Sequence, residues 1–248
     1  MVMEDDSAII EPRKIPGDPE IDHPLILTLF EPYLEILRKE LKLKKSSLKR
    51  LRFPSMAYYT TALDGQKISI CGTPLGAPQA AILLERLIAM GAKKIMAFGC
   101  CGSLQPDLLI GHLVIPTESL SEEGTSRHYP LPERVEPRAD AGIVKLILEN
   151  CQKKKLKSVA GKVWTTDALF RETREKAERY SRMDLLAVEM EMSALLTIAA
   201  YRQVHLAGLM VVSDELAALK WKTGFLDPFF WLASKKVARV VIELCRNL

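Results

Sequence analysis

Two carboxylates stand where an apolar run gives way to a helix-forming run. Glu189 and Glu191 follow the apolar residues 185–188 and precede the run 193–201, which predicts a buried strand leading into a helix. Residues two apart on a helix do not face each other, so we expect the two carboxylates to diverge. Such a pair suits a polyol such as ribose, whose hydroxyl groups donate hydrogen bonds. The alternative is two ordinary helix N-terminal acids, favoured by the helix dipole.

Three more polar positions follow predicted strands. Thr166 ends the run 157–166, and Asp214 follows the apolar run 206–213. Gly99-Cys100-Cys101-Gly102 follows the strand 94–98 and is expected to form a turn whose backbone N–H groups face an anion. A dinucleotide-binding loop is the alternative there, but its full glycine spacing is absent. For Asp214 the alternative is a helix N-cap.

The surrounding elements indicate an α/β fold with a mixed sheet. Asp64-Gly65 joins two strand-like runs, 57–63 and 67–72, which is a strong hairpin signal. Strands and helices then alternate along the chain, and ligands in such sheets bind at the carboxyl ends of strands. Residues 1–23 are rich in proline and charge and are expected to form an extended arm, followed by a single domain over 24–248.

Composition restricts the possible partners. The 248 residues carry a net charge of only +4, which gives no reason to expect nucleic acid, and no apolar run is long enough to span a bilayer. The acidic N-terminus lacks the parts of a signal peptide. The five cysteines show no metal-ligand spacing, so we expect reduced thiols, no metal and a cytoplasmic location.

Taken together, the strand-end motifs resemble one family. Gly99-Cys100-Cys101-Gly102, Thr165-Thr166-Asp167, Val188-Glu189-Met190-Glu191 and Val212-Ser213-Asp214 have the order and spacing of the nucleoside phosphorylase superfamily. This superfamily contains purine nucleoside phosphorylase, uridine phosphorylase and methylthioadenosine nucleosidase, and the resemblance runs from about Leu25 to the C-terminus. It implies a three-layer α/β/α fold with a central mixed, strongly twisted and partly barrel-like sheet. It also implies a homo-oligomer (dimer, trimer or hexamer).

The resemblance assigns roles to the carboxylates. Glu191 would hold the ribose 2′- and 3′-hydroxyls while Met190 packs on the sugar, and Glu189 would either bind ribose or support the structure. Asp214 would protonate or hydrogen-bond N7 of a departing purine, a role that burial of an acid assists. The base pocket implied by the resemblance comprises Cys101, Gly102, Thr166, Leu169, Phe170 and Asp214.

Phosphate binding is where the chain departs from the family. Gly99, Cys100 and Arg52 match phosphate-binding positions, with Arg52 reaching a neighbouring subunit, although the family has Ser or Thr where Cys100 stands. Two expected arginines are replaced, one by Leu34 (or Ile21 in another alignment) and one by Ala97. The hydrolytic members instead activate water with a glutamate, for which the candidates here are Glu31 and Glu20. Other possible phosphate ligands are Arg127, Arg171 and Arg174.

The resemblance implies a phosphorylase that cleaves the N-glycosidic bond of a purine nucleoside with phosphate, giving free base and ribose 1-phosphate. The segment 123–129 resembles the uridine phosphorylase branch, which favours phosphate as the acceptor. The alternatives are a nucleosidase that uses water and a nucleoside-binding protein without catalysis. Phosphate is a co-substrate, and no cofactor is implied.

Overall fold

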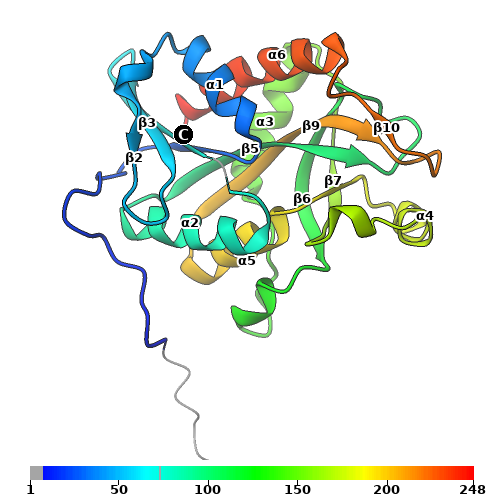
Figure 1. Cartoon of the computed structure of the whole chain (residues 1–248), viewed down its shortest axis with the longest axis horizontal. Coiled ribbons are helices and arrows are strands. Elements are labelled where there is room, and N and C mark those ends of the chain that lie inside the picture. Colours follow the sequence, from blue (N-terminus) through cyan, green and yellow to red (C-terminus); the bar gives the residue numbers. More distant parts are fainter. Residues whose placement is uncertain (1–7, 73) are drawn as a thin grey trace, which may run out of the picture.

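A mixed sheet forms the centre of the molecule in the computed structural model, which describes residues 8–72 and 74–248 (Figure 1). In these residues the sheet has ten strands in the order β10-β9-β6-β7-β8-β5-β1-β4-β3-β2. The strands are β1 (Leu25–Thr28), β2 (Lys49–Arg50), β3 (Ala57–Leu63), β4 (Gln66–Gly72), β5 (Lys94–Ser103), β6 (Leu113–Ser121), β7 (Ser158–Thr165), β8 (Ala187–Glu189), β9 (His205–Glu215) and β10 (Lys222–Thr223).

Part of this sheet closes on itself. Strand β9 pairs with β6 on one side and with β5 on the other, while β5 also pairs with β8, so that β5, β9, β6, β7 and β8 form a ring. The sheet continues from β5 as an open part that consists of β1, β4, β3 and β2. The predicted mixed, partly barrel-like sheet is therefore confirmed.

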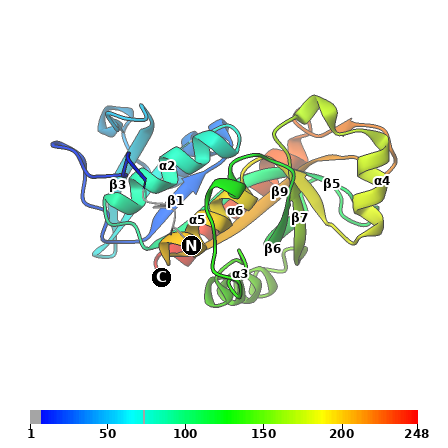
Figure 2. The same ribbon diagram turned by 90° about the horizontal axis from the view of Figure 1, so that it is seen from below.

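Helices cover both faces of the sheet. The α-helices are α1 (Glu31–Glu40), α2 (Ala77–Ala89), α3 (Ala141–Lys153), α4 (Arg174–Arg182), α5 (Met192–Arg202) and α6 (Pro228–Cys245), and the short 3₁₀ turns are η1 (Lys45–Ser47), η2 (Ser126–His128) and η3 (Leu169–Arg171). Figure 1 shows α1 and α6 on one side of the sheet and α2 and α5 on the other, and Figure 2 shows α3 and α4 around the closed part.

The alternation of side chains along the strands explains the layers. In β1, Leu25 and Leu27 belong to the apolar cluster that α2 and α5 complete, whereas Ile26 belongs to the cluster under α1, α3 and α6. Successive strand residues point to opposite faces, so a strand covered on both sides reads as a continuous apolar run. The same division separates Ala97 from Phe98 in β5.

The predicted hairpin is confirmed, and one predicted turn is wrong. Asp64 and Gly65 connect β3 to β4 with positive φ angles of 49° and 83°, as a two-residue hairpin loop requires. By contrast, Gly99 to Gly102 do not form an anion-binding turn. They continue β5 as far as Ser103, paired with β9, and the register shifts between Cys101 and Gly102. Pairing with β9, which the local glycine pattern does not reveal, extends this strand.

The N-terminal arm has no helix or strand in its described part, Ala8 to His23, and its first residues lead away from the body (Figure 1). Two of its contacts with the body are buried. Ile21 is buried in the core beside α2, and its backbone N–H donates to the carbonyl of Met90 over 2.9 Å. Asp18 forms an ion pair with Arg86 in which the two side chains are 1% and 8% exposed. None of the helices in the described part of the chain is long and apolar enough to cross a membrane.

Candidate active site

Three strand ends meet at one edge of the closed sheet. Gly102 near the end of β5 lies opposite Val188 of β8 on one side and Asp214 of β9 on the other. Glu191 stands two residues beyond the end of β8, so Glu191 and Asp214 flank the end of β5. Gly102 has no room for a side chain, because a Cβ atom there would lie 2.9 Å from the Asp214 Oδ2 atom.

Both carboxylate oxygens of Glu189 accept hydrogen bonds from other groups of the protein. Its Oε2 atom accepts the backbone N–H groups of Glu191 and Met192, each over 2.7 Å, and its Oε1 atom accepts the Thr165 hydroxyl. The carboxylate therefore caps the first turn of α5 and ties it to β7. Burial raises the pKa of Glu189 to about 7. This arrangement is that of a structural acceptor, the second of the two roles considered for Glu189.

Glu191 binds a different part of the chain, as predicted, although Glu189 ends β8 and Glu191 is the N-cap of α5, so neither residue lies within the helix. Its Oε1 atom accepts the backbone N–H of Gly76, at the start of α2, over 2.7 Å. The side chain makes no other hydrogen bond to the residues that the structure describes, although the residue is only 5% exposed. Burial first, and then the charge of Glu189, raises the pKa of Glu191 to about 8. Since Glu189 accepts three hydrogen bonds and Glu191 one, we place the proton of this pair on Glu191.

A third buried carboxylate, Glu123, is hydrogen-bonded to the start of α5. Glu123 is 4% exposed and accepts hydrogen bonds from the hydroxyls of Ser121, Ser126 and Ser193. Burial raises its pKa, but these hydrogen bonds outweigh burial and the pKa of Glu123 is lowered. The charged Glu123 links the loop around η2 to α5 and adds to the upward shift of the Glu189 pKa.

Asp214 belongs to β9 and begins no helix, so the N-cap alternative is wrong. Its Oδ1 atom accepts the Ser213 hydroxyl over 2.7 Å, and its Oδ2 atom accepts the indole N–H of Trp221 over 2.9 Å. Burial raises the pKa of Asp214, against the opposing effect of these two hydrogen bonds. Burial and the charge of Asp214 also raise the pKa of Glu172, to about 7.

The thiol of Cys100 lies near the carboxyl groups on both sides of the site. Burial raises its pKa to about 12, and the charges of Asp214 and Glu191 both contribute. Cys100 is therefore within electrostatic reach of both carboxyl groups and is a neutral thiol. Cys101, next along β5, is buried, and its carbonyl oxygen accepts the Ser213 hydroxyl over 3.2 Å.

The remaining predicted base-pocket residues lie after β7. Thr166 is 3% exposed, and its hydroxyl accepts the backbone N–H of Ala168 over 3.2 Å. Leu169 and Phe170 are 52% and 96% exposed. Phe170 therefore provides no buried aromatic wall for a base, because its ring projects into solvent from η3.

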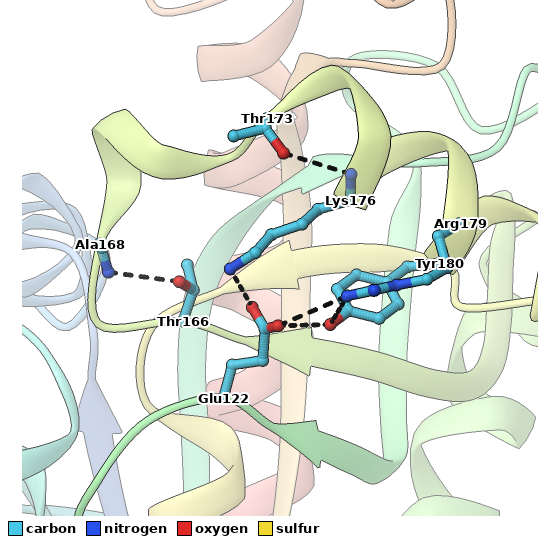
Figure 3. A network of polar contacts seen from close by, with 7 residues as sticks. All are labelled: Glu122, Thr166, Ala168, Thr173, Lys176, Arg179 and Tyr180. Atoms are coloured by element: carbon cyan, nitrogen blue, oxygen red, sulfur yellow. Dashed lines mark hydrogen bonds and ion pairs between the residues drawn. The ribbon is translucent and has the colours of Figure 1, made fainter.

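A polar network anchors α4, the helix that follows these residues. Figure 3 shows Lys176, Arg179 and Tyr180 converging on Glu122 at the end of β6. The Lys176 ammonium lies 2.8 Å from one Glu122 oxygen, and the Tyr180 hydroxyl donates to the other. The network fixes α4 to the sheet and so limits where the preceding segment, 166–173, can lie.

The positions expected to carry phosphate-binding arginines are apolar and packed. Ala97 is fully buried, Ile21 is 2% exposed and Leu34 packs against the core. Leu34 shares its apolar cluster with an aromatic group in which Phe30 contacts Tyr33, with ring centroids 5.1 Å apart, and Trp231, 6.1 Å apart.

Arg52 lies far from Cys100 within the chain. It follows β2, which is separated from β5 by three strands, or roughly 19 Å at the usual strand spacing. The exposed Arg52 guanidinium lies against Gly17 of the arm. Arg127, Arg171 and Arg174 lie on the surface or near it. One chain thus does not bring Arg52 to Gly99 and Cys100.

Sequence reasoning missed Glu172, Trp221 and the backbone N–H of Gly76. Trp221 and Glu172 stand in polar, irregular segments with no periodic signal, so nothing local marks them. Gly76 belongs to a predicted Gly/Pro turn, but a backbone donor has no residue signature. Its φ of 80° is the only sign that the turn is specialised.

This architecture, a partly closed mixed sheet with helices on both faces, is that of the nucleoside phosphorylases. Uridine phosphorylase from Vibrio fischeri has the same fold, with a TM-score of 0.77 over 92% of this chain and 93% of that one, at 20% identity. The chain belongs to the phosphorylase superfamily, whose family model matches residues 25–246.

Two curated relatives are more similar in sequence. Guanosine phosphorylase from Halorubrum lacusprofundi is 31% identical over 157 residues, which are 62% of this chain and 64% of that protein. A DeoD-type purine nucleoside phosphorylase from Caldanaerobacter subterraneus is 29% identical over 159 residues, which are 64% of this chain and 68% of that protein. The matched segment thus spans about two thirds of each relative.

Proposed function

We propose that the chain cleaves the N-glycosidic bond of a purine nucleoside. The observation that carries this proposal is the position of Glu191 and Asp214 on either side of the end of β5. Two carboxyl groups in different environments suit two tasks, holding the sugar and assisting departure of the base. The names of the two curated relatives, guanosine phosphorylase and purine nucleoside phosphorylase, support the choice of base.

Glu191 has the features needed to hold ribose. It is buried and fixed by one backbone donor, and its remaining lone pairs are available for the 2′- and 3′-hydroxyls. The hydrogen bond to the 2′-hydroxyl strengthens as positive charge develops at C1′, so it stabilises the transition state more than the substrate. Met190, which is half-buried between the two glutamates, would pack on the sugar.

Asp214 would act as the general acid. When the bond between C1′ and N9 breaks, its electron pair leaves with the base, and a proton delivered to N7 makes that base a better leaving group. Burial raises the pKa of Asp214, which favours the protonated form that this step requires. Such assistance contributes about 10²- to 10⁴-fold in rate.

Phosphate is the acceptor we propose, by analogy with the relatives, which are named phosphorylases. A phosphate oxygen would bond to C1′ and give ribose 1-phosphate. Arg52 would reach Cys100 and Gly99 only from a second copy of the chain, which accords with a homo-oligomer. Water is a second candidate acceptor, because Leu34 and Ala97 supply no charge where the family places arginines.

The test is release of free base from guanosine, inosine, adenosine and uridine, with and without phosphate. Phosphate-dependent release from the purine nucleosides supports phosphorolysis, and release independent of phosphate supports hydrolysis. Asp214→Asn should lower kcat for purines at least 10²-fold, whereas Asp107→Asn, a change at an exposed acid outside the site, should not. Unchanged turnover in Asp214→Asn would remove this residue from the mechanism.

A further inference from the structure

An exposed tryptophan is hydrogen-bonded to the candidate general acid. Trp221 is 68% exposed and lies just before β10, yet its indole N–H donates to Asp214 Oδ2 over 2.9 Å. A large aromatic side chain in water gains little from burial. The polar end of this side chain, and not apolar packing, is therefore what orients it.

The two donors to Asp214 differ in how firmly they are held. Ser213 is 2% exposed, and its hydroxyl lies within hydrogen-bond distance of both Asp214 and the Cys101 carbonyl. Trp221 extends from an irregular segment that includes Leu219 with a φ of 54°. That segment is fastened mainly at its ends, at the buried Leu216 and at Gly224, whose N–H donates to the Ser213 carbonyl over 2.8 Å. Of the two, only the indole can leave without disturbing the core.

We propose that Trp221 is a positioning residue for Asp214, whose indole N–H holds the carboxylate until a nucleoside base takes its place. The proposal rests on the proposed function, because it assigns Asp214 to the base. The buried Ser213 hydroxyl donates to Oδ1 of Asp214 and the exposed indole N–H donates to Oδ2, so Oδ2 is the oxygen from which a base can most easily displace the donor. The base and Trp221 therefore compete for the same oxygen.

Displacement of the indole by the base also changes the protonation of Asp214. An N–H donor stabilises the carboxylate form, so its departure favours protonation of Asp214 as N7 of the base arrives. The other titratable groups facing Asp214 are Glu172, from the segment before α4, and the thiols of Cys100 and Cys101 on β5. The ion pair between Lys222 and Glu215 lies one residue along the β9–β10 ladder. None of these groups is a donor to Asp214 that could replace the indole.

The first experiment is independent of catalysis. Protonation of an adjacent carboxylate changes indole emission, so the fluorescence of the wild-type protein should titrate with Asp214. The titration should disappear in Asp214→Asn and in Trp221→Phe, while Trp164 and Trp231 continue to emit. Guanosine, with base release followed in parallel, should change the Trp221 emission of the wild type. An identical titration in Asp214→Asn, or guanosine binding with unchanged emission, overturns the proposal even if cleavage is never observed.

The second experiment is the pH profile of kcat/KM for guanosine. Trp221→Phe keeps an aromatic side chain but removes the indole N–H, so the pKa of Asp214 should rise. The alkaline limb of the profile should then move to higher pH by about 0.5–1 pH unit. Lys220→Ala, at an exposed neighbour in the same segment, should leave the limb in place. A loss of kcat in Trp221→Phe without a moved limb would indicate a merely structural role and contradict the proposal.

Discussion

At the scale of single residues, the two glutamates at the end of β8 and just beyond it show how the same type of side chain takes different tasks. Glu189 accepts two backbone N–H groups and a hydroxyl, whereas Glu191 accepts a single backbone N–H. A carboxylate whose oxygens are already fully hydrogen-bonded by the protein has a structural role. A buried carboxylate with unused lone pairs is available for a ligand.

Substituting the two glutamates separately should separate stability from binding. Glu189→Gln places an amide against two backbone donors, so we expect the free energy of unfolding to fall by about 2–3 kcal/mol. Glu191→Gln keeps an acceptor for Gly76 and should unfold at similar urea concentration near pH 6, while KM for the nucleoside rises at least tenfold. Urea denaturation and steady-state kinetics check both results, and equal loss of stability in the two variants would contradict the division of roles.

The raised pKa values make stability depend on pH. Glu189, Glu191 and Glu172 have pKa values of about 7, 8 and 7, above the ordinary carboxyl value of 4.5. Between pH 5 and 8 the folded chain therefore binds more protons at these sites than the unfolded chain, so their contribution to stability falls as pH rises.

Glu191→Gln removes one of these titrating groups, so the free energy of unfolding should depend less steeply on pH in the variant. Relative to the wild type, the variant should gain on the order of 2 kcal/mol in unfolding free energy between pH 5 and pH 8. Titrating groups that do not interact with Glu191 cancel in the difference between the two proteins, so this difference reports the pair formed by Glu191 and Glu189. Parallel curves for the two proteins, measured by urea denaturation at several pH values, would show that Glu191 is ionised throughout.

At the scale of elements, the site depends on how closely β5, β8 and β9 approach. Gly102 faces Asp214 across the register shift in β5, and a Cβ atom there would also lie 2.6 Å from Leu216 Cδ1. The glycine is thus required by space and not by its φ angle.

Gly102→Ala should push Asp214 and Leu216 away from β5. We expect kcat/KM for purine nucleosides to fall more than tenfold, since displacement of about 1 Å at a catalytic group has effects of that order or larger. Gly124→Ala is the matched control, because a Cβ atom there meets its nearest neighbour at an ordinary 3.6 Å. Equal activity of both variants in base release would refute the packing argument.

At the scale of the whole molecule, the arm is held to the body by charge as well as by apolar contact. The Asp18–Arg86 pair is almost completely buried, and the Arg86 Nε–H also donates to the Phe53 carbonyl over 3.0 Å. A cavity of about 680 Å³ lies between the arm and the C-terminal end of α5, lined by residues such as Ile10 and Tyr201. This cavity is roughly 15 Å along α5 from Glu191 and is separate from the candidate active site.

Breaking the buried pair should destabilise the fold strongly. Asp18→Asn leaves the Arg86 guanidinium buried without its counter-charge, and we expect a loss of about 3–5 kcal/mol in unfolding free energy. Glu20→Gln removes an exposed partner of Lys14 and should cost less than about 1 kcal/mol. Thermal and urea denaturation compare the two, and a small effect of Asp18→Asn would mean that the arm is not part of the folded core.

Much of the fold followed from local pattern. The Asp64-Gly65 hairpin, the helix after Glu191 and the strands expected at 157–166 and 206–213 were predicted close to their observed positions, because side-chain periodicity and turn residues act over a few neighbours. The divergence of Glu189 and Glu191 was also predicted, but the helix spacing used to predict it does not apply, because Glu189 ends β8 and Glu191 is the N-cap of α5.

Tertiary structure decided what the local pattern left open. Pairing of β5 with β9 turned Gly99 to Gly102 from a predicted loop into strand, and pairing of β10 with β9 brought Trp221 onto Asp214. Whether Glu189 or Glu191 has unused acceptors depended on Thr165 and Gly76, which are far away in the sequence. Residue types and their spacing therefore determined which groups could do chemistry, whereas the closing of the sheet determined which of them meet, because hydrogen bonds and burial depend on neighbours that the chain brings together only when it folds.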